Sequence, residues 1–206
     1  MKKLMGLFCA FVLTAQAASV LALGLDIKTG LGVGMFNPPK VNDIKDVTYD
    51  GVEDSTNAVV GEGVAGIRLN KKLSGGLSVN WSLTKYDATS SLTGNWEVTQ
   101  GFFAGNAFGQ YNILTGRFRP YLKLTAGMFG RGLTVVDRAT NSLLFVADES
   151  LAYHLAGGLG MDLGITHRTY LYGEFQYHSF GVEAEKVAQI NGILGIGYTF
   201  ADIFDF

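Results

Sequence analysis

The sequence has few cysteines, which cross-link a small soluble domain, and few prolines, which bend its backbone. Its 206 residues include one cysteine, Cys9, and three prolines. Cys9 lies in the apolar N-terminal stretch, so no disulfide is expected in the chain after it. Hydrophobic residues make up 48% of the sequence, yet after residue 22 no apolar run approaches the ~18 residues of a transmembrane helix. We therefore expect one domain without membrane-spanning helices.

Positive charge is also scarce. The chain has 16 lysines and arginines against 18 acidic residues. Lys2 and Lys3 belong to the N-terminal stretch, which leaves 14 basic residues and a net charge of −4 in the remainder. An acidic chain of this kind is not expected to bind nucleic acid. Glycine, by contrast, is abundant, with 28 residues.

Residues 1–22 have the layout of a secretory signal peptide. Lys2 and Lys3 precede the mostly apolar residues 4–13, and small residues that allow cleavage after Ala17 or Ala22 follow. This stretch is too short to span a bilayer as a helix. The residues before Cys9 are not the small ones of a lipoprotein site, so no lipid anchor is expected. Residues 23–206 are therefore expected to form the exported domain.

Apolar and polar residues alternate with a period of two along this domain. In the first segment Leu25, Ile27 and Leu31 share one face, whereas Asp26 and Lys28 share the other. A strand separates two such sets of side chains and a helix does not. The same alternation predicts eight strands, at about residues 25–35, 58–69, 77–84, 97–111, 118–129, 153–165, 171–178 and 189–200.

The fourth of these segments is the least regular. If Gln100, Asn106 and Gln110 share the polar face, Phe102 and Phe108 fall on that face as well. A β-bulge would shift the register and remove this conflict.

The connections between the segments alternate in length. Long ones are expected at residues 37–57, 87–95, 132–150 and 181–188, and tight turns join the other pairs. This layout indicates an all-β fold, an eight-stranded antiparallel up-and-down transmembrane β-barrel with short periplasmic turns and longer extracellular loops. Apolar residues at 133–136 and 143–147 suggest that the third long connection extends its strands as a hairpin. The exposed edge of such a hairpin can pair with a partner strand.

A soluble barrel of the lipocalin type would turn its apolar face inward. The signal peptide and the small or charged residues of the polar face favour the inverted arrangement, with apolar side chains in lipid. Aromatic residues support it because they gather near both ends of the strands, as at the two interfaces of a membrane. They are Tyr111, Phe118, Tyr170, Tyr198 and Phe200 at the turn end, and Trp81, Tyr153 and Tyr177 at the loop end.

The last two segments, LYGEFQYH at 171–178 and GILGIGYTF at 192–200, resemble the closing hairpin of the outer-membrane β-barrel superfamily. That superfamily includes the OmpA transmembrane domain and the OmpX/Ail and opacity-type proteins. Arg119-Pro120-Tyr121-Leu122 with Ala126-Gly127 resembles its fifth strand. The resemblance implies export through the periplasm to the outer membrane of a Gram-negative bacterium. It also implies contact with lipopolysaccharide and other outer-membrane lipids.

The same resemblance implies insertion by the outer-membrane assembly machinery, which reads an aromatic signal at the C-terminus. The candidates for this signal are Tyr198, Phe200 and Phe206. Residues 201–205 separate the last two, so either Phe200 or Phe206 is the terminal aromatic of the signal.

The polar face is expected to form a network inside the barrel. Its members are Glu62, Arg68, Asn80, Lys123, His154, Asp162, Glu174, Gln176 and His178. One interpretation is a narrow pore. The other is a plug, which we favour because buried charges must be paired and an eight-stranded barrel is only wide enough for its own side chains.

Members of the superfamily are structural anchors, adhesins and host-interaction proteins, with a minority of lipid-modifying enzymes. His178 and Ser179 resemble the catalytic pair of lipid A deacylases. Adjacent strand residues face opposite sides, however, and a catalytic base must reach its nucleophile. No catalysis is therefore expected at this pair.

The long connections are acidic, so an extracellular protein or a cation is a candidate partner there. Their acidic residues include Asp43, Asp46, Asp50, Glu53, Asp54, Asp137, Asp148, Glu149, Glu183 and Glu185, against the basic Lys40, Lys45, Arg138 and Lys186. They lack the regular oxygen-ligand spacing of a calcium loop. We expect a non-enzymatic barrel without cofactor or metal that serves membrane integrity or surface interaction. A narrow small-solute channel and a lipid A or phospholipid-modifying enzyme are the alternatives.

Overall fold

The computed structural model describes residues 24–36, 51–52, 56–90, 94–137, 139–140, 142–182 and 185–200. These form strands β1 (Gly24–Phe36), β2 (Gly51–Val52), β3 (Thr56–Arg68), β4 (Leu73–Ser90), β5 (Gly94–Asn112), β6 (Phe118–Asp137), β7 (Ser142–Gly164), β8 (Thr169–Val182) and β9 (Glu185–Thr199). None of the described segments is a helix with the length and apolarity needed to cross a membrane. The expected signal peptide, the acidic residues of the first connection, Glu183 and Phe206 lie outside the described residues.

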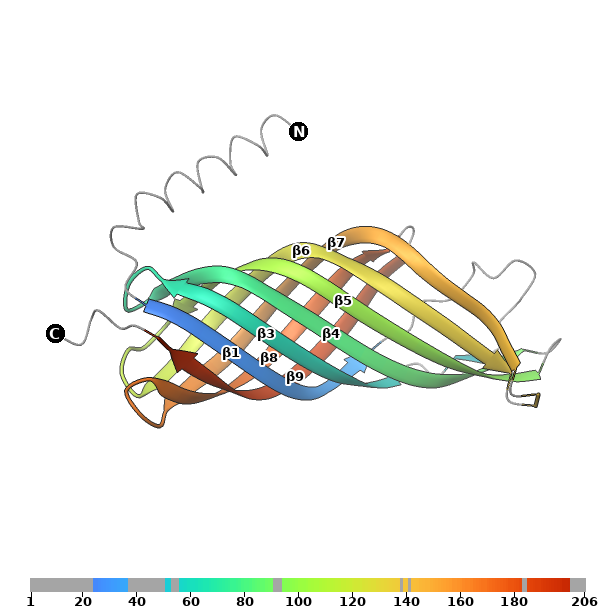
Figure 1. The fold of residues 1–206 in the computed structure, drawn as a ribbon, viewed down its shortest axis with the longest axis horizontal. Coiled ribbons are helices and arrows are strands. Elements are labelled where there is room, and N and C mark those ends of the chain that lie inside the picture. Colours follow the sequence, from blue (N-terminus) through green and yellow to red (C-terminus); the bar gives the residue numbers. More distant parts are fainter. Residues whose placement is uncertain are drawn as a thin grey trace, which may run out of the picture.

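The eight long strands close into one antiparallel barrel (Figure 1). β1 pairs with β3 on one side and β9 on the other, and the order runs on through β8, β7, β6 and β5 to β4, which pairs with β3. β2 adds a short pairing along β4. Closure gives the wall strands backbone partners on both sides, which lipid requires because it offers no hydrogen bonds. The predicted eight-stranded antiparallel barrel is confirmed.

Tight turns close one end of the barrel. At residues 69–72 the Asn70 side-chain oxygen accepts hydrogen bonds from the N–H groups two and three residues later, at 2.8 and 2.9 Å. At residues 165–168 the Thr166 hydroxyl does the same, at 3.2 and 2.9 Å. At residues 113–117 Gly116 has a φ of 117°, in the left-handed region that favours glycine. The residue types that look like turn formers in the sequence therefore form these turns.

The strands fall into two groups of different length. β1, β3, β8 and β9 have 13, 13, 14 and 15 residues, whereas β4, β5, β6 and β7 have 18, 19, 20 and 23. In Figure 1 the longer strands run on past the shorter ones at the end opposite the tight turns. The parts of β4, β5, β6 and β7 that extend beyond the other strands form a four-stranded extension of the wall, which we call the projecting sheet.

Three of the long connections are shorter than expected because strand pairing continues into them. The last described pairs are Ser90 with Gly94, Asp137 with Ser142, and Val182 with Glu185. Residues 87–95, 132–150 and 181–188 are therefore mostly strand and not loop. The expected extension of the third connection as a hairpin is confirmed.

The fourth predicted strand, now β5, contains no β-bulge. β5 pairs without interruption with β4 and with β6, so Phe102 and Phe108 point into the barrel beside Gln100 and Asn106. Register shifts occur instead between β6 and β7, after Phe129 and after Val135.

The barrel is inverted relative to a soluble one. Outward-facing apolar side chains are largely exposed, as Val33 at 70%, Leu124 at 73% and Leu194 at 76% show. Inward-facing charged side chains such as Glu62 and Lys123 are each only 3% exposed. Such an apolar outer surface is stable only where lipid covers it.

Candidate functional site

The interior of the barrel carries the polar side chains, so it is the candidate site. All nine predicted network residues point inward and are at most 9% exposed. They do not form one cluster. They lie in successive layers from the turn end toward the loop end, and other residues connect them.

The layer at the turn end joins β1, β3 and β9. The Arg68 guanidinium donates to the Asp26 carboxylate at 2.6 Å and to the Thr199 hydroxyl at 2.9 Å. Thr199 in turn donates to Asp26. Each charge is thereby paired at the point where the last strand closes against the first.

Lys28 forms the next layer, within a ring of aromatic side chains. Its ammonium group donates to Asp162 at 3.1 Å and to Gln110 at 3.2 Å. The same ammonium lies 4.6, 5.4 and 5.3 Å from the ring centroids of Tyr121, Tyr170 and Tyr172. Aromatic faces stabilise a desolvated cation, so they support the ion pair with Asp162.

Lys123 lies at the centre of the third layer and pairs with two carboxylates. It donates to Glu62 and, at 3.3 Å, to Glu174. Tyr121 donates to Glu174 at 2.8 Å, and Gln176 donates to Glu174 at 2.9 Å and to Glu62 at 3.2 Å. The two carboxylates thus share one ammonium group and the neutral donors Tyr121 and Gln176, which satisfies most of their hydrogen-bonding capacity.

His178 and His154 continue the chain of hydrogen bonds toward the loop end. His178 Nε2 lies 2.6 Å from Gln176 Oε1, and His178 Nδ1 lies 2.9 Å from His154 Nε2. His154 Nδ1 lies 2.6 Å from the Asn106 side-chain amide, which contacts Asn80 at 2.9 Å. The chain therefore links the Lys123 layer to β4 on the far side of the barrel.

The protonation of the two histidines depends on the orientation of the Asn106 amide. If the amide oxygen faces His154, the two rings together need three N–H groups and carry one positive charge. If the Asn106 and Asn80 amides are both turned, the Asn106 NH₂ faces His154 and the Asn80 NH₂ faces Asn106; both rings are then neutral and each contact joins a donor to an acceptor. Amide oxygen and nitrogen are interchangeable in shape, and the neutral arrangement avoids burying a further charge. We therefore assign two neutral histidines.

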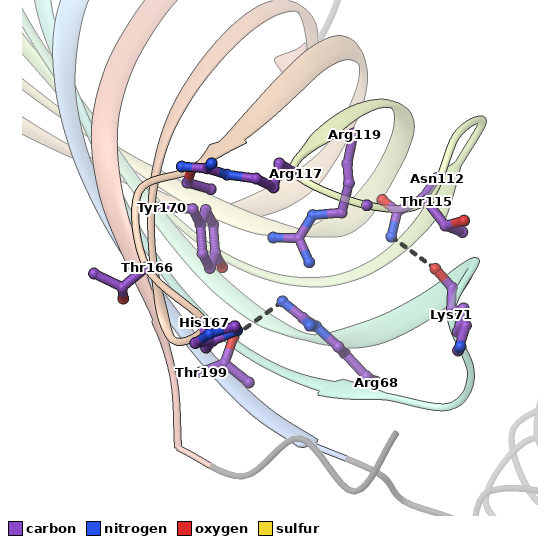
Figure 2. A pocket seen from close by; sticks show the side chains of 12 residues that line it. Arg68, Lys71, Asn112, Thr115, Arg117, Arg119, Thr166, His167, Tyr170 and Thr199 are labelled. Carbon is purple, nitrogen blue, oxygen red and sulfur yellow. Dashed lines mark hydrogen bonds between the residues drawn. The ribbon is translucent and has the colours of Figure 1, made fainter. Parts of the chain in front are cut away.

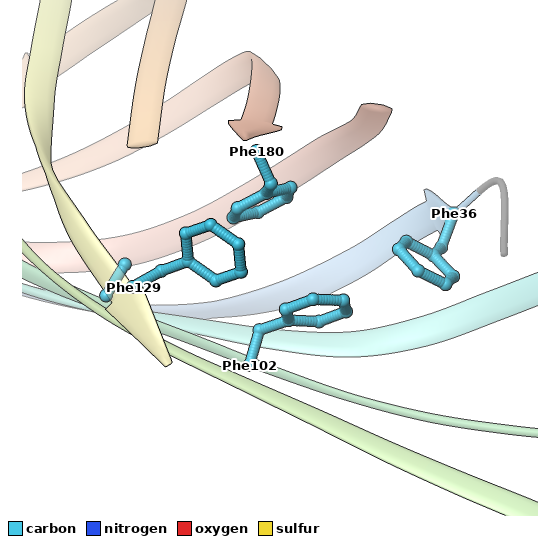
Figure 3. Close-up of a cluster of buried hydrophobic side chains, with 5 residues drawn as sticks. Phe36, Phe102, Phe129 and Phe180 are labelled. Carbon is cyan, nitrogen blue, oxygen red and sulfur yellow. The ribbon is translucent and has the colours of Figure 1, made fainter. Parts of the chain in front are cut away.

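Four phenylalanines lie next to the histidines on their loop-end side (Figure 3). Phe102 lies 5.2, 5.9 and 5.0 Å from the ring centroids of Phe36, Phe129 and Phe180. Phe180 also stacks on His154 at 4.9 Å. All four rings are at most 5% exposed. We call these four residues the phenylalanine cluster. It is apolar and lies directly on the loop-end side of the histidines.

The structure corrects or extends the sequence analysis of this interior. Tyr170, predicted to belong to the interfacial aromatics, is 2% exposed and points inward, because it shares its face with the even-numbered residues of β8. Sequence reasoning also left out several interior residues that join the layers. Those residues are Asp26, Lys28, Asn106, Gln110, Tyr121 and Thr199.

The other predicted aromatics lie on the outside. Tyr198 and Phe200, which belong to the predicted assembly signal, are 38% and 51% exposed, and their rings contact each other at 5.0 Å. Phe200 continues the backbone ladder by one bond, from its N–H to Leu25 O at 2.8 Å. The role of these residues in assembly stays a prediction.

The side chains of His178 and Ser179, the pair that resembles a deacylase site, do not face each other. His178 points inward, whereas Ser179 pairs with the outward-facing Leu155 and so lies on the opposite face of β8. Within the described part of the chain, no group of three or more histidine, cysteine, aspartate or glutamate side chains is arranged to hold a metal ion.

No protein-family model and no curated protein sequence matches the chain. Solved structures do match it. Neisserial surface protein A is 14% identical with a TM-score of 0.57, over 86% of this chain and 97% of its own. The outer membrane protein OprG of Pseudomonas aeruginosa is 18% identical with a TM-score of 0.51, over 87% and 97%. The attachment invasion locus protein Ail of Yersinia pestis is 13% identical with a TM-score of 0.50, over 86% and 99%.

At these identities the likeness is one of fold. The chain has the fold of these small outer-membrane β-barrels, and its apolar outer surface fits a lipid environment.

Proposed function

We propose that this chain is a closed, non-enzymatic membrane anchor that holds the projecting sheet outside the bilayer for contact with a partner at the cell surface. The observation that carries this proposal is the length of β4 to β7, which have 18 to 23 residues. A tilted strand needs only about 9–11 residues to cross the hydrocarbon core. The remaining length therefore serves a purpose outside the membrane.

The projecting sheet has an unpaired edge on β7. β7 pairs with β8 only from His154 to Gly164, so among the described strands residues 142–153 have β6 as their one neighbour. Such an edge presents backbone N–H and C=O groups in a row, and an extended segment of another protein can add to it as a further strand. On the opposite side β4 pairs with β3 as far as Thr84, and β2 covers only Ala88 and Thr89.

The inner face of the sheet is packed, which favours a rigid surface. Tyr86, Trp96, Val98 and Val135 are 1–5% exposed, although they lie beyond the polar layers of the barrel. The outer face carries an exposed ion pair, Lys85 with Glu97 at 2.9 Å. A stiff sheet with a polar outer face suits reversible contact with another molecule, because little conformational freedom is lost on binding.

The neighbours are compatible with this proposal. One of them is named as an attachment and invasion protein, and adhesion by this chain is the corresponding proposal. The same proposal includes lipopolysaccharide and outer-membrane lipids around the barrel and the assembly machinery during insertion. A small-solute channel is the second candidate, but the paired charges and the phenylalanine cluster in series favour a closed interior.

Shortening the projecting sheet tests the proposal. Residues 133–147 are replaced by a two-residue Asn-Gly turn between the paired Gly132 and Asp148, and residues 86–98 likewise between the paired Lys85 and Thr99. Non-adherent Gram-negative cells that display each form are then bound to a panel of immobilised matrix glycoproteins. We expect the full chain to confer adhesion and the shortened chain to lose it, although the shortened chain still folds by heat-modifiable gel mobility. Equal adhesion of the two folded forms overturns the proposal.

A further inference from the structure

A basic cavity opens at the turn end of the barrel (Figure 2). Its volume is about 400 Å³, which is room for a small polyatomic ion with some water. Five basic side chains line it, and none of its described lining residues is acidic. The basic residues are Arg68, Lys71, Arg117, Arg119 and His167, from three different strand ends and turns.

The acidic residues behind this cavity do not balance its positive charge. Asp26 pairs with Arg68, and Asp162 is shared by Lys28 at 3.1 Å and Arg119 at 3.5 Å. Two carboxylates are therefore the counter-ions of three basic side chains. Lys71 and Arg117 add charge from the exposed turns. The field at the mouth of the cavity is attractive to anions, and the low dielectric of the barrel wall strengthens it.

Two buried donors in the cavity have no hydrogen-bond partner within the described structure. One is the hydroxyl of Tyr170, a residue that is 2% exposed and lines the cavity; the other is Arg119 Nε. A buried donor without a partner is unfavourable, and native proteins contain few of them. The Arg119 guanidinium carbon lies 5.0 Å from the Tyr170 ring centroid, and both residues line the same cavity. Figure 2 shows the two side chains extending into it together.

The position of Tyr170 is set by a glycine on the neighbouring strand. A Cβ at Gly197 would come within 2.3 Å of the Tyr170 ring. Any other residue at position 197 would therefore displace the ring and its hydroxyl. The unpartnered hydroxyl is thus held in place by the barrel wall.

We propose that this cavity is an oxyanion-binding site, which takes a compact phosphate or carboxylate group from the periplasmic side. The oxyanion accepts hydrogen bonds from Tyr170 and Arg119 and neutralises the excess charge of the mouth. Two sources of this chemistry are available. One is a free phosphate-class anion; the other is the chain itself, because Asp202 and Asp205 follow Thr199, a lining residue, by three and six positions.

The test uses the full barrel, isotopically labelled and folded in micelles, titrated with inorganic phosphate at constant ionic strength. We expect saturable chemical-shift changes at the amides of the turns 113–117 and 165–168. Tyr170→Phe should weaken phosphate binding about tenfold, as expected for a hydrogen bond to a charged acceptor. If a free anion is the occupant, the same variant should leave the urea midpoint measured without phosphate unchanged, because its hydroxyl then has no partner to lose.

Matched controls separate binding from general effects. Tyr172→Phe removes another buried, unpartnered hydroxyl, which does not line the cavity, and should leave phosphate binding unchanged. Lys71→Gln should weaken binding about threefold and Lys72→Gln, on the same turn but outside the cavity, by less. Non-saturable shifts, or equal phosphate affinities in wild type and Tyr170→Phe, would overturn the proposal.

A double variant, Asp202→Asn with Asp205→Asn, identifies the source. If the chain supplies the oxyanion itself, phosphate should bind at least tenfold more tightly to this variant, because the tethered competitor is gone. If a free anion is the occupant, the affinity for phosphate should not change. Both results require the same site, and Tyr170→Phe must weaken phosphate binding in either background.

Discussion

The two halves of the barrel interior are lined by the same strands but built from different chemistry. The turn-end half holds charges in pairs: Lys28 and Lys123 are bonded to carboxylates across the lumen, and Arg68 to one on the neighbouring strand. The loop-end half holds the phenylalanine cluster, whose rings contact one another and stack on His154 and His178. The stability of the polar half depends on every charged group keeping its partner, whereas the stability of the apolar half depends on how well the side chains fill the available volume.

This difference has a physical basis. A buried ion pair gains little net stability, but removing one partner leaves an uncompensated charge. A packed aromatic cluster loses contacts gradually when one ring is shortened, in proportion to the cavity that remains. The polar half is therefore expected to fail sharply on single substitutions and the apolar half in smaller steps.

The largest effect is expected at the centre of the polar half. Lys123→Met leaves Glu62 and Glu174 buried without a cation, and should lower the free energy of unfolding by about 3–5 kcal/mol. Lys85→Met breaks the exposed pair with Glu97, whose two side chains are 62% and 36% exposed, and should change it by less than about 1 kcal/mol. Urea unfolding in detergent, followed by heat-modifiable gel mobility, measures both.

A compensated variant sharpens this prediction. Lys123→Met with Glu62→Gln and Glu174→Gln removes all three charges together, and should recover most of the lost stability. Similar unfolding midpoints for Lys123→Met and Lys85→Met would show that the interior charges are not a paired network.

A smaller difference between matched variants is expected in the apolar half, where two adjacent residues of β5 provide the comparison. Phe102 is 5% exposed inside the cluster, and Phe103 is 60% exposed on the outer face. Phe102→Ala should lower the free energy of unfolding by about 3–5 kcal/mol, because it loses both transfer energy and packing. Phe103→Ala should lower it by about 1.5–3 kcal/mol, because lipid fills the space and only the transfer energy is lost. Reversed magnitudes would contradict the assigned faces of β5.

The smallest effect is expected at the tip of the β6–β7 hairpin, outside the membrane. The Thr140 hydroxyl and the Ala139 N–H donate to the Asp137 carboxylate, at 2.7 and 2.9 Å, and lower its pKa. The folded-state pKa lies below the unfolded one, so this contribution is present above about pH 4 and is lost as the pH falls through the lowered pKa. The Ala139 amide resonance should therefore be constant from pH 5 to 8 and shift only below about pH 4. In Asp137→Asn it should not titrate in that range.

Much of this architecture follows from the sequence, because the period of two assigns each side chain to a face. The alternation alone places Lys123, Asp162 and His154 on the inner face, where all three are buried. It fails at Phe102 and Phe108, which are apolar but lie inside the barrel; Phe108 lies 5.6 Å from the Lys123 ammonium in the turn-end half. The alternation also leads to an overestimate of loop length, because strands that continue beyond the membrane no longer alternate between lipid-facing apolar residues and inward-facing polar ones.

The partners inside the lumen could not be predicted in the same way. Lys28 and Asp162 are 134 positions apart in sequence and meet only because the stagger of the closed barrel brings them to the same height. That stagger depends on the register of all eight strands together. Tyr170 shows the converse, because its position near a strand end suggests the membrane interface while its parity places it inside.

The most direct test of the closed interior is conductance across planar lipid bilayers with the purified, folded chain. The ion-paired layers and the phenylalanine cluster in series predict no conductance steps above those of a protein-free bilayer, at any salt concentration. Discrete steps that grow in proportion to salt concentration, from protein shown to be folded by its heat-modifiable mobility, would contradict the account and establish a channel.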